Sequence, residues 1–112
     1  MDTQCDLTNK KCQPCEGGVP PLSQNEVTAL LQQISGWTQR DMLIEKTFTF
    51  KNYYHTMAFV NAVAWLAHRE DHHPDLTVGY KTCQVVYSTH AIGGLSENDF
   101  ICAAKVDALF AI

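Results

Sequence analysis

The alternation of apolar and polar positions divides the chain after residue 22 into helical and extended segments. A first helix is predicted from a stripe of apolar residues at helical spacing, namely Val27, Leu30, Leu31 and Ile34. Ser23 and Glu26 fit a capping box at the start of this helix, and Gly36 fits its end.

A hairpin is predicted next, with its turn at Arg40 and Asp41. Its second strand, residues 43–50, is rich in β-branched and aromatic side chains. The apolar face of this strand carries Ile44, Phe48 and Phe50. The opposite face is polar, so one side of the sheet is expected to face solvent.

A long helix is predicted from Asn52, which can cap it, to about Asp71, and Pro74 prevents its continuation. Its apolar residues form two stripes, one with Met57, Val60, Ala64 and Ala67 and the other with Phe59, Val63 and Leu66. An apolar arc of this width indicates a helix covered on more than one side, by the sheet and by a second subunit.

Two short strands, residues 76–80 and 83–89, are predicted to form a second hairpin, followed by a loop over residues 91–95. Residues 96–110 begin with a sequence like a capping box and continue with apolar residues at helical spacing. The order α-β-β-α-β-β-α predicts an α+β fold, a four-stranded antiparallel sheet with three helices packed on one face. Residues 1–22 are expected to be a polar leader arm, and residues 23–112 a single domain.

Composition and charge narrow the range of functions. The net charge of −4 argues against a general nucleic-acid binder, which would carry a basic face. No apolar run approaches the roughly 18 residues that a membrane span needs. The first residues lack the apolar core of a secretory signal, so a cytoplasmic protein with no membrane association is expected.

The chain has five cysteines, and in the cytoplasm reduced thiols are the default state. Cys12 and Cys15 form a single C-x-x-C pair with Cys5 nearby, which is a weak signal for redox or zinc chemistry, and the role of these three residues stays open. Cys83 and Cys102 lie in apolar patterns and are predicted to be small core residues.

Four of the five histidines lie between residues 68 and 90. His72 and His73 come where the long helix ends, and His90 ends the last predicted strand. If this strand returns antiparallel beside residues 76–80, the three rings meet in one pocket. Neutral imidazoles give and take protons near neutral pH, so the cluster indicates acid/base catalysis.

A zinc site is the alternative interpretation, because His68 and His72 are four residues apart on a helix and His90 can supply a third ligand. Against it, Arg69 stands where a metalloprotease motif has glutamate. The position of His68 is equally compatible with a place in the pocket and with a place on the protein surface. Structural roles are expected for several other polar and aromatic residues: His55 on the surface, Asp99 in a helix cap, Tyr80 in the core or a pocket wall, and Trp37 and Trp65 in packing.

These residues together resemble the pterin-4a-carbinolamine dehydratase family, and the resemblance covers nearly the whole chain. The matching motif comprises His72-His73-Pro74, Tyr80, Thr89-His90, Gly94-Leu95-Ser96 and Asp99. The segment from Cys12 to Leu22 is similar to the leader of bacterial members, and Gly36-Trp37 also matches. The fold that the family implies agrees with the predicted order of elements.

The resemblance implies dehydration of 4a-hydroxytetrahydrobiopterin to quinonoid dihydropterin and water, a step that recycles the pterin cofactor of aromatic amino-acid hydroxylases. It implies that His72, His73 and His90 line the site, with His72 and His90 transferring protons and His73 orienting the pterin. No metal or organic cofactor is required.

By the same resemblance, four further residues contact the pterin, namely Pro74, Thr89, Ala91 and Ile92. Asp99 is expected to orient a catalytic group without contacting the pterin itself. His68 is expected to support the catalytic groups in the same way as Asp99, although many members have a carboxylate at this position. Glu70 or Asp71 would have to replace that carboxylate, but each points in a different direction from the helix.

The resemblance also implies a homodimer or homotetramer. Two alternatives to this recycling role stay open at this stage. One is a non-catalytic dimerisation or transcriptional coactivator-type binding module, and the other is pterin handling in molybdopterin metabolism.

Overall fold

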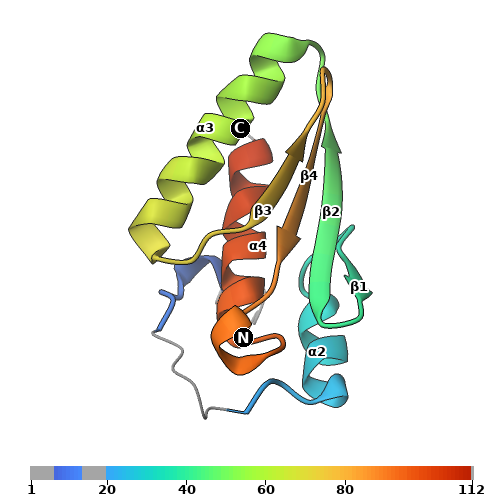
Figure 1. Ribbon diagram of the computed structural model, residues 1–112, viewed down its shortest axis with the longest axis vertical. Helices are drawn as coiled ribbons and strands as arrows, with labels where there is room; N and C mark the ends of the chain where they lie inside the picture. The colour runs from blue at the N-terminus through green and yellow to red at the C-terminus, as the bar shows by residue number, and fades with distance from the viewer. Residues whose placement is uncertain (1–6, 14–19, 112) are drawn as a thin grey trace.

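The structure, a computed structural model, describes residues 7–13 and 20–111. In this part of the chain the elements follow one another in the predicted order (Figure 1): α2 (Gln24–Leu31), β1 (Thr38–Arg40), β2 (Leu43–Thr49), α3 (Tyr53–Glu70), β3 (Asp75–Val78), β4 (Thr82–Tyr87), the 3₁₀ turn η1 (His90–Ile92) and α4 (Glu97–Phe110). The predicted α+β class is confirmed. The predicted loop after β4 begins instead with the η1 turn.

The four strands form one antiparallel sheet in the order β1-β2-β4-β3. The pairing of β3 with β4 brings Asp75, at the start of β3, opposite Val86, near the end of β4. The chain entering β3 and the chain leaving β4 therefore lie at the same end of the sheet. This is the relationship on which the predicted histidine pocket depended.

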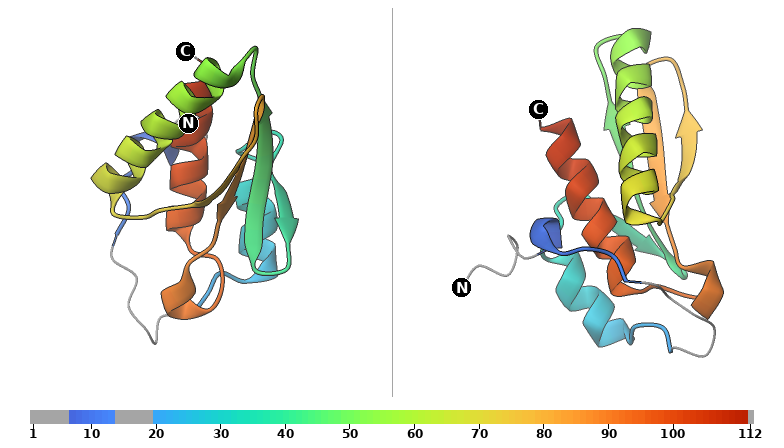
Figure 2. Two further views of the ribbon diagram at one scale, coloured as in Figure 1. Left: turned by 45° about the horizontal axis from the view of Figure 1, so that its top comes forward. Right: turned by 90° about the vertical axis from the view of Figure 1, so that its left-hand side faces the viewer.

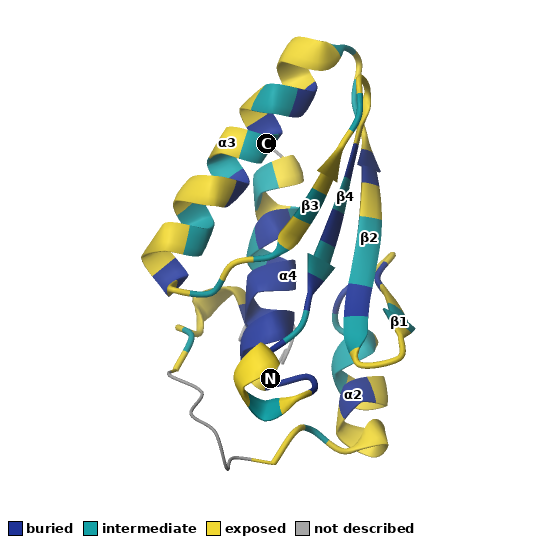
Figure 3. Cartoon of the chain, viewed as in Figure 1, coloured by how far each residue is buried: buried dark blue, intermediate teal, exposed yellow. Residues whose placement is uncertain are grey.

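The helices pack on one face of the sheet (Figure 2). On that face β4 contributes Cys83, Val85 and Tyr87, all completely buried, because alternate residues of a strand point to the same side. Phe100 and Ile101 of α4 pack into the same core. Figure 3 shows burial concentrated along α4 and β4, whereas the outer face of α3 is exposed.

The predicted cap at Asn52 and the predicted end of the long helix near Asp71 are both confirmed. The Asn52 side chain accepts a hydrogen bond from the backbone N–H of His55, and the helix ends at Asp71. Of the two apolar stripes, the one with Phe59 and Val63 is buried against the core. The other stripe, with Met57, Val60, Ala64 and Ala67, is half-buried or exposed.

Two aromatic predictions are wrong. Trp65 is 65% exposed, because it lies on the side of α3 that faces away from the sheet, whereas Trp37 is buried as expected. Tyr80 is 67% exposed, because β3 ends at Val78 and the alternation that assigned Tyr80 to the core stops with it. The Tyr80 ring stacks on the ring of Tyr53 instead, with 6.0 Å between centroids.

The described part of the leader lies against the domain. Residues 7–9 are helical, and Leu7 belongs to the hydrophobic core. Cys5 and Cys15 lie outside the described residues. No helix in the ranges that the structure describes is both long enough and apolar enough to span a membrane.

Candidate active site

The three motif histidines converge because of how α3 ends. Asp71 adopts a left-handed conformation with φ of 53°, and its N–H bonds to the carbonyl oxygens of Ala67 and His68. This cap reverses the chain, so His72 and His73 leave the helix and lead into β3. His90 follows β4 at the same end of the sheet.

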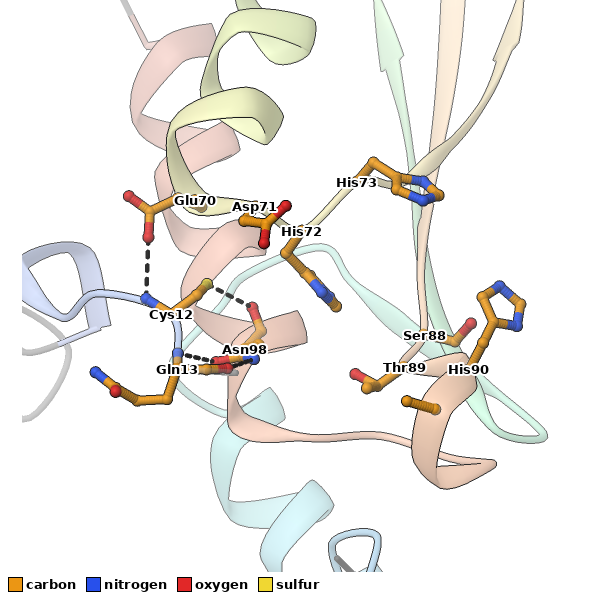
Figure 4. A pocket seen from close by; sticks show the side chains of 11 residues that line it. Cys12, Gln13, Glu70, Asp71, His72, His73, Ser88, Thr89, His90 and Asn98 are labelled. Carbon is orange, nitrogen blue, oxygen red and sulfur yellow. Dashed lines mark hydrogen bonds between the residues drawn. The ribbon is translucent and has the colours of Figure 1, made fainter. Parts of the chain in front are cut away.

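The histidines line a pocket of about 370 Å³. Figure 4 shows His72, His73 and His90 around it, with the leader on the opposite side. The full lining is Cys12, Gln13, Glu70, Asp71, His72, His73, Ser88, Thr89, His90, Ala91 and Asn98. His73 and His90 are exposed, and His72 is largely buried. The predicted meeting of the three residues in one pocket is therefore found.

His72 is held from two sides. Its Nε2 atom is 2.6 Å from Oδ1 of Asp99, and its ring stacks on Tyr87 with the planes 7° apart. Both contacts come from elements that lie far from His72 in the sequence. They fix the orientation of the imidazole before any substrate arrives.

Asp99 lies in the first turn of α4 and is completely buried. Its Oδ2 atom accepts hydrogen bonds from the Thr89 hydroxyl at 2.8 Å and from the Ser96 N–H at 2.9 Å. These contacts hold the carboxyl group in place, with its Oδ1 atom beside Nε2 of His72. The capping role predicted for Asp99 is thus combined with a direct contact to the pocket, which the local pattern alone did not reveal.

The remaining predicted site residues lie in three different places. Thr89 and Ala91 line the histidine pocket, but the Thr89 hydroxyl is directed to Asp99 and to Ser96. Pro74 lines a neighbouring pocket of about 410 Å³ together with His68. Ile92 is half-buried and lines neither of these two pockets.

His68 is exposed, and its ring packs beside Trp65 with 5.4 Å between centroids. Glu70 does not replace the missing carboxylate at His68, because it faces the leader: its Oε1 atom accepts from the Cys12 N–H at 3.0 Å. Its Oε2 atom lies 3.0 Å from Nζ of Lys105. Burial alone would raise the pKa of Glu70, but these two partners lower it below its usual value.

The leader wall of the pocket, formed by Cys12 and Gln13, was missed by reasoning from the sequence. The Asn98 side chain clamps Gln13 by accepting from its N–H at 3.0 Å and donating to its carbonyl at 2.6 Å. Lys10 pairs with Glu97 at 2.7 Å. No local pattern marks Asn98 or Glu70 for this role, because both contacts join residues far apart in the sequence.

A metal centre was the alternative interpretation of the histidines. Among the residues that the structure describes, no three or more His, Cys, Asp or Glu side chains are grouped so that they can hold an ion. His68 lines the second pocket, His90 lines the first, and the Nε2 atom of His72 faces Asp99.

Comparisons with known proteins agree with this geometry. Residues 20–109 match the family described as Pterin 4 alpha carbinolamine dehydratase. A relative from Nitrosospira multiformis is 68% identical over the full length of both chains, and one from Dechloromonas aromatica is 54% identical, also over both full lengths. Both carry the provisional name pterin-4-alpha-carbinolamine dehydratase.

Solved structures give the same result. A Brucella melitensis protein described as a transcriptional coactivator/pterin dehydratase superposes with a TM-score of 0.77 and 28% identity, covering 80% of this chain and 97% of that one. A pterin dehydratase-like protein described as a RuBisCO assembly factor in the alpha-carboxysome gives a TM-score of 0.55 at 28% identity, over 65% and 84% of the two chains. The chain belongs to the pterin-4-alpha-carbinolamine dehydratase family.

Proposed function

We propose that this protein is a hydro-lyase that dehydrates 4a-hydroxytetrahydrobiopterin to quinonoid dihydropterin and water. The observation that carries the proposal is the buried Asp99–His72 pair beside His73 and His90 in one pocket. Membership of the family supports the substrate class. In this proposal aromatic amino-acid hydroxylases supply the substrate, and its dehydration is a step in recycling their pterin cofactor.

The reaction needs the 4a-hydroxyl group protonated as it leaves and a ring N–H proton removed. Because Asp99 accepts at Nε2 of His72, the proton on that nitrogen is fixed, and Nδ1 is the atom that can exchange a proton. His90 is exposed in the same pocket and can act at another point on the substrate. Two imidazoles can thus perform both transfers, since histidine is the side chain that most readily both gives and takes a proton near neutral pH.

His73 is assigned to orienting the pterin, because it is exposed and lies next to His72 on the segment that leads into β3. Ala91 and the backbone around Thr89 form the wall against which the ring would lie. Pro74 and His68 line the neighbouring pocket, and Ile92 follows Ala91 in η1. In this mechanism protons move only between substrate, imidazoles and water.

The test is dehydration of synthetic 4a-hydroxytetrahydropterin followed by ultraviolet absorbance, with the spontaneous reaction as baseline. The wild-type protein is assayed with and without EDTA. Acceleration that survives EDTA supports a histidine dehydratase that needs no exchangeable metal. Activity that EDTA abolishes and zinc restores would favour the metal interpretation instead.

No acceleration over the baseline would refute the proposed activity. The fold would then serve binding, as in a dimerisation or coactivator-type module. Sedimentation of the same sample measures the oligomeric state, which we propose to be a homodimer or homotetramer. The half-buried and exposed apolar stripe of α3, with Met57, Val60 and Ala64, supports this part of the proposal.

A further inference from the structure

Two thiols touch where the leader meets α4. The Sγ atoms of Cys12 and Cys102 lie 3.4 Å apart, although the two residues are 90 positions apart in the sequence. Both are free cysteines. Cys12 is half-buried, and Cys102 is completely buried. To form a disulfide, the sulfurs would have to approach by about 1.4 Å, which is within reach of side-chain rotation.

The hydrogen bonds around the pair give the two sulfurs different roles. The Cys12 thiol donates to the carbonyl oxygen of Asn98, with 3.8 Å between the heavy atoms. The Cys102 thiol is then left to donate to the sulfur of Cys12. This hydrogen bond and burial raise the pKa of Cys102, so the Cys102 thiol stays protonated. The sulfur of Cys12 is then the one that can react with a solute.

Only one thiol of the pair, that of Cys12, can be reached from the pocket. Cys12 lines the histidine pocket, and in Figure 4 it lies across that pocket from His90. A small solute that enters the pocket can therefore reach the sulfur of Cys12, while Cys102 is reached only through Cys12. Cys83, which is buried in β4, is closed to solvent and serves as an internal reference thiol.

We propose that Cys12 and Cys102 are an oxidation site at which a peroxide converts two thiols into a disulfide that fastens the leader to α4. The Cys12 sulfur attacks one oxygen of hydrogen peroxide, the O–O bond breaks, and the departing hydroxide takes the Cys12 proton and leaves as water, so that Cys12 becomes a sulfenic acid. The Cys102 sulfur then attacks the Cys12 sulfur, the S–O bond breaks, and the hydroxide leaves with the Cys102 proton as a second water. Two thiols are oxidised and one peroxide is reduced to two waters.

The bond would act on the wall of the pocket. Residues 12 and 13 are now held there only by non-covalent contacts, chiefly those of Glu70 and Asn98. A covalent link between Cys12 and Cys102 closes a long loop, which restricts the unfolded chain and stabilises the folded one. Reduction by a dithiol would release the segment again. The disulfide would therefore be a reversible covalent link between the leader and α4. It does not depend on the reaction proposed for the pocket.

The experiment treats the folded wild-type protein with a few equivalents of hydrogen peroxide, then denatures it and alkylates the remaining thiols. Digestion with trypsin and glutamyl endopeptidase separates Cys83 from Cys102, because cleavage follows Lys81, Glu97 and Lys105. The expected product is a cross-link between peptides 12–16 and 98–105 that a dithiol reverses, with Cys83 alkylated. The oxidised protein should also melt several degrees higher than the reduced protein.

Cys12→Ser and Cys15→Ser are the matched variants. In Cys12→Ser, Cys102 should stay alkylatable at the same peroxide dose, and in Cys15→Ser the cross-link should form as in the wild type. The proposal is overturned if Cys102 of the folded wild-type protein stays fully alkylatable, or if Cys12 pairs with Cys15 instead. Circular dichroism before oxidation establishes that each variant is folded.

Discussion

The fully buried Asp99 carboxylate holds the ring of His72, a histidine that lines the pocket, in one orientation. Their 2.6 Å contact joins the segment after α3 to the first turn of α4. Asp99 is itself fixed by the Thr89 hydroxyl and the Ser96 N–H. The orientation of the His72 ring is thus set by a network of hydrogen bonds within the protein itself.

Replacing Asp99 with asparagine should lower turnover by roughly 10- to 100-fold, because an amide cannot accept from all three donors and the His72 tautomer is released. Loss of the buried charge-assisted bonds should also cost about 1–3 kcal/mol of unfolding free energy. The pterin assay and chemical denaturation measure the two effects.

The matched control for this variant is Asp107→Asn. Asp107 is also on α4, where it accepts from Nε1 of Trp37 at 3.1 Å and from Nζ of Lys46 at 2.9 Å, but it does not line the histidine pocket. The Asp107→Asn variant should lose stability and keep the turnover number of the wild type. Equal turnover in both variants would show that Asp99 has no role in orienting His72 for turnover.

Glu70→Gln should destabilise the protein by about 1–3 kcal/mol at neutral pH, because the buried carboxylate loses its charged contacts to Lys105 and Cys12. The folded-state pKa of Glu70 lies below its ordinary 4.5. Its stabilising contribution is therefore fully present above pH 4.5 and is lost as the pH falls through the lower folded value.

Urea denaturation of wild type and Glu70→Gln from pH 7 to pH 3 measures this dependence. The difference in unfolding free energy should stay constant down to about pH 5 and then shrink. Glu97→Gln, which breaks the exposed pair with Lys10, should cost less than about 1 kcal/mol. A difference between wild type and Glu70→Gln that grows on acidification would contradict the account.

Tyr87→Phe should leave stability unchanged or raise it by about 1 kcal/mol. In the described part of the chain the buried Tyr87 hydroxyl makes no well-formed hydrogen bond, and the nearby Cys102 thiol is at most a weak partner, so removing the hydroxyl ends a desolvation cost. The ring that stacks on His72 is retained, so turnover should change by less than a factor of about three. Thermal denaturation and the pterin assay check both statements, and a loss of more than about 2 kcal/mol would show that the hydroxyl has a partner.

The order of elements was predictable because each signal is local. Ser23, Asn52 and Pro74 mark helix boundaries through their own backbone and capping chemistry. The meeting of His72 and His90 followed from the antiparallel pairing of β3 with β4, which a short connection favours. Boundaries were less well predicted: α2 ends at Leu31 and not at Gly36, because the residues between form turns.

The contacts that complete the pocket could not be predicted in this way. The clamp of Asn98 on Gln13, the bond from Cys12 to Glu70 and the contact of Cys12 with Cys102 each join positions more than 50 residues apart. Such contacts depend on how the leader packs against α3 and α4. For the same reason the exposure of Trp65 was misjudged, since periodicity alone does not show which face of a helix is covered.

The most direct test of the proposed mechanism compares His72→Ala and His90→Ala with His55→Ala in the dehydration assay, at matched folding by circular dichroism. His55 is an exposed histidine at the start of α3, remote from the pocket in sequence and absent from its lining. The account predicts that each pocket variant loses roughly a hundredfold or more in turnover, the scale of a general acid or base, and that His55→Ala keeps wild-type turnover. Near-normal turnover in both folded pocket variants would contradict histidine acid/base catalysis at this site.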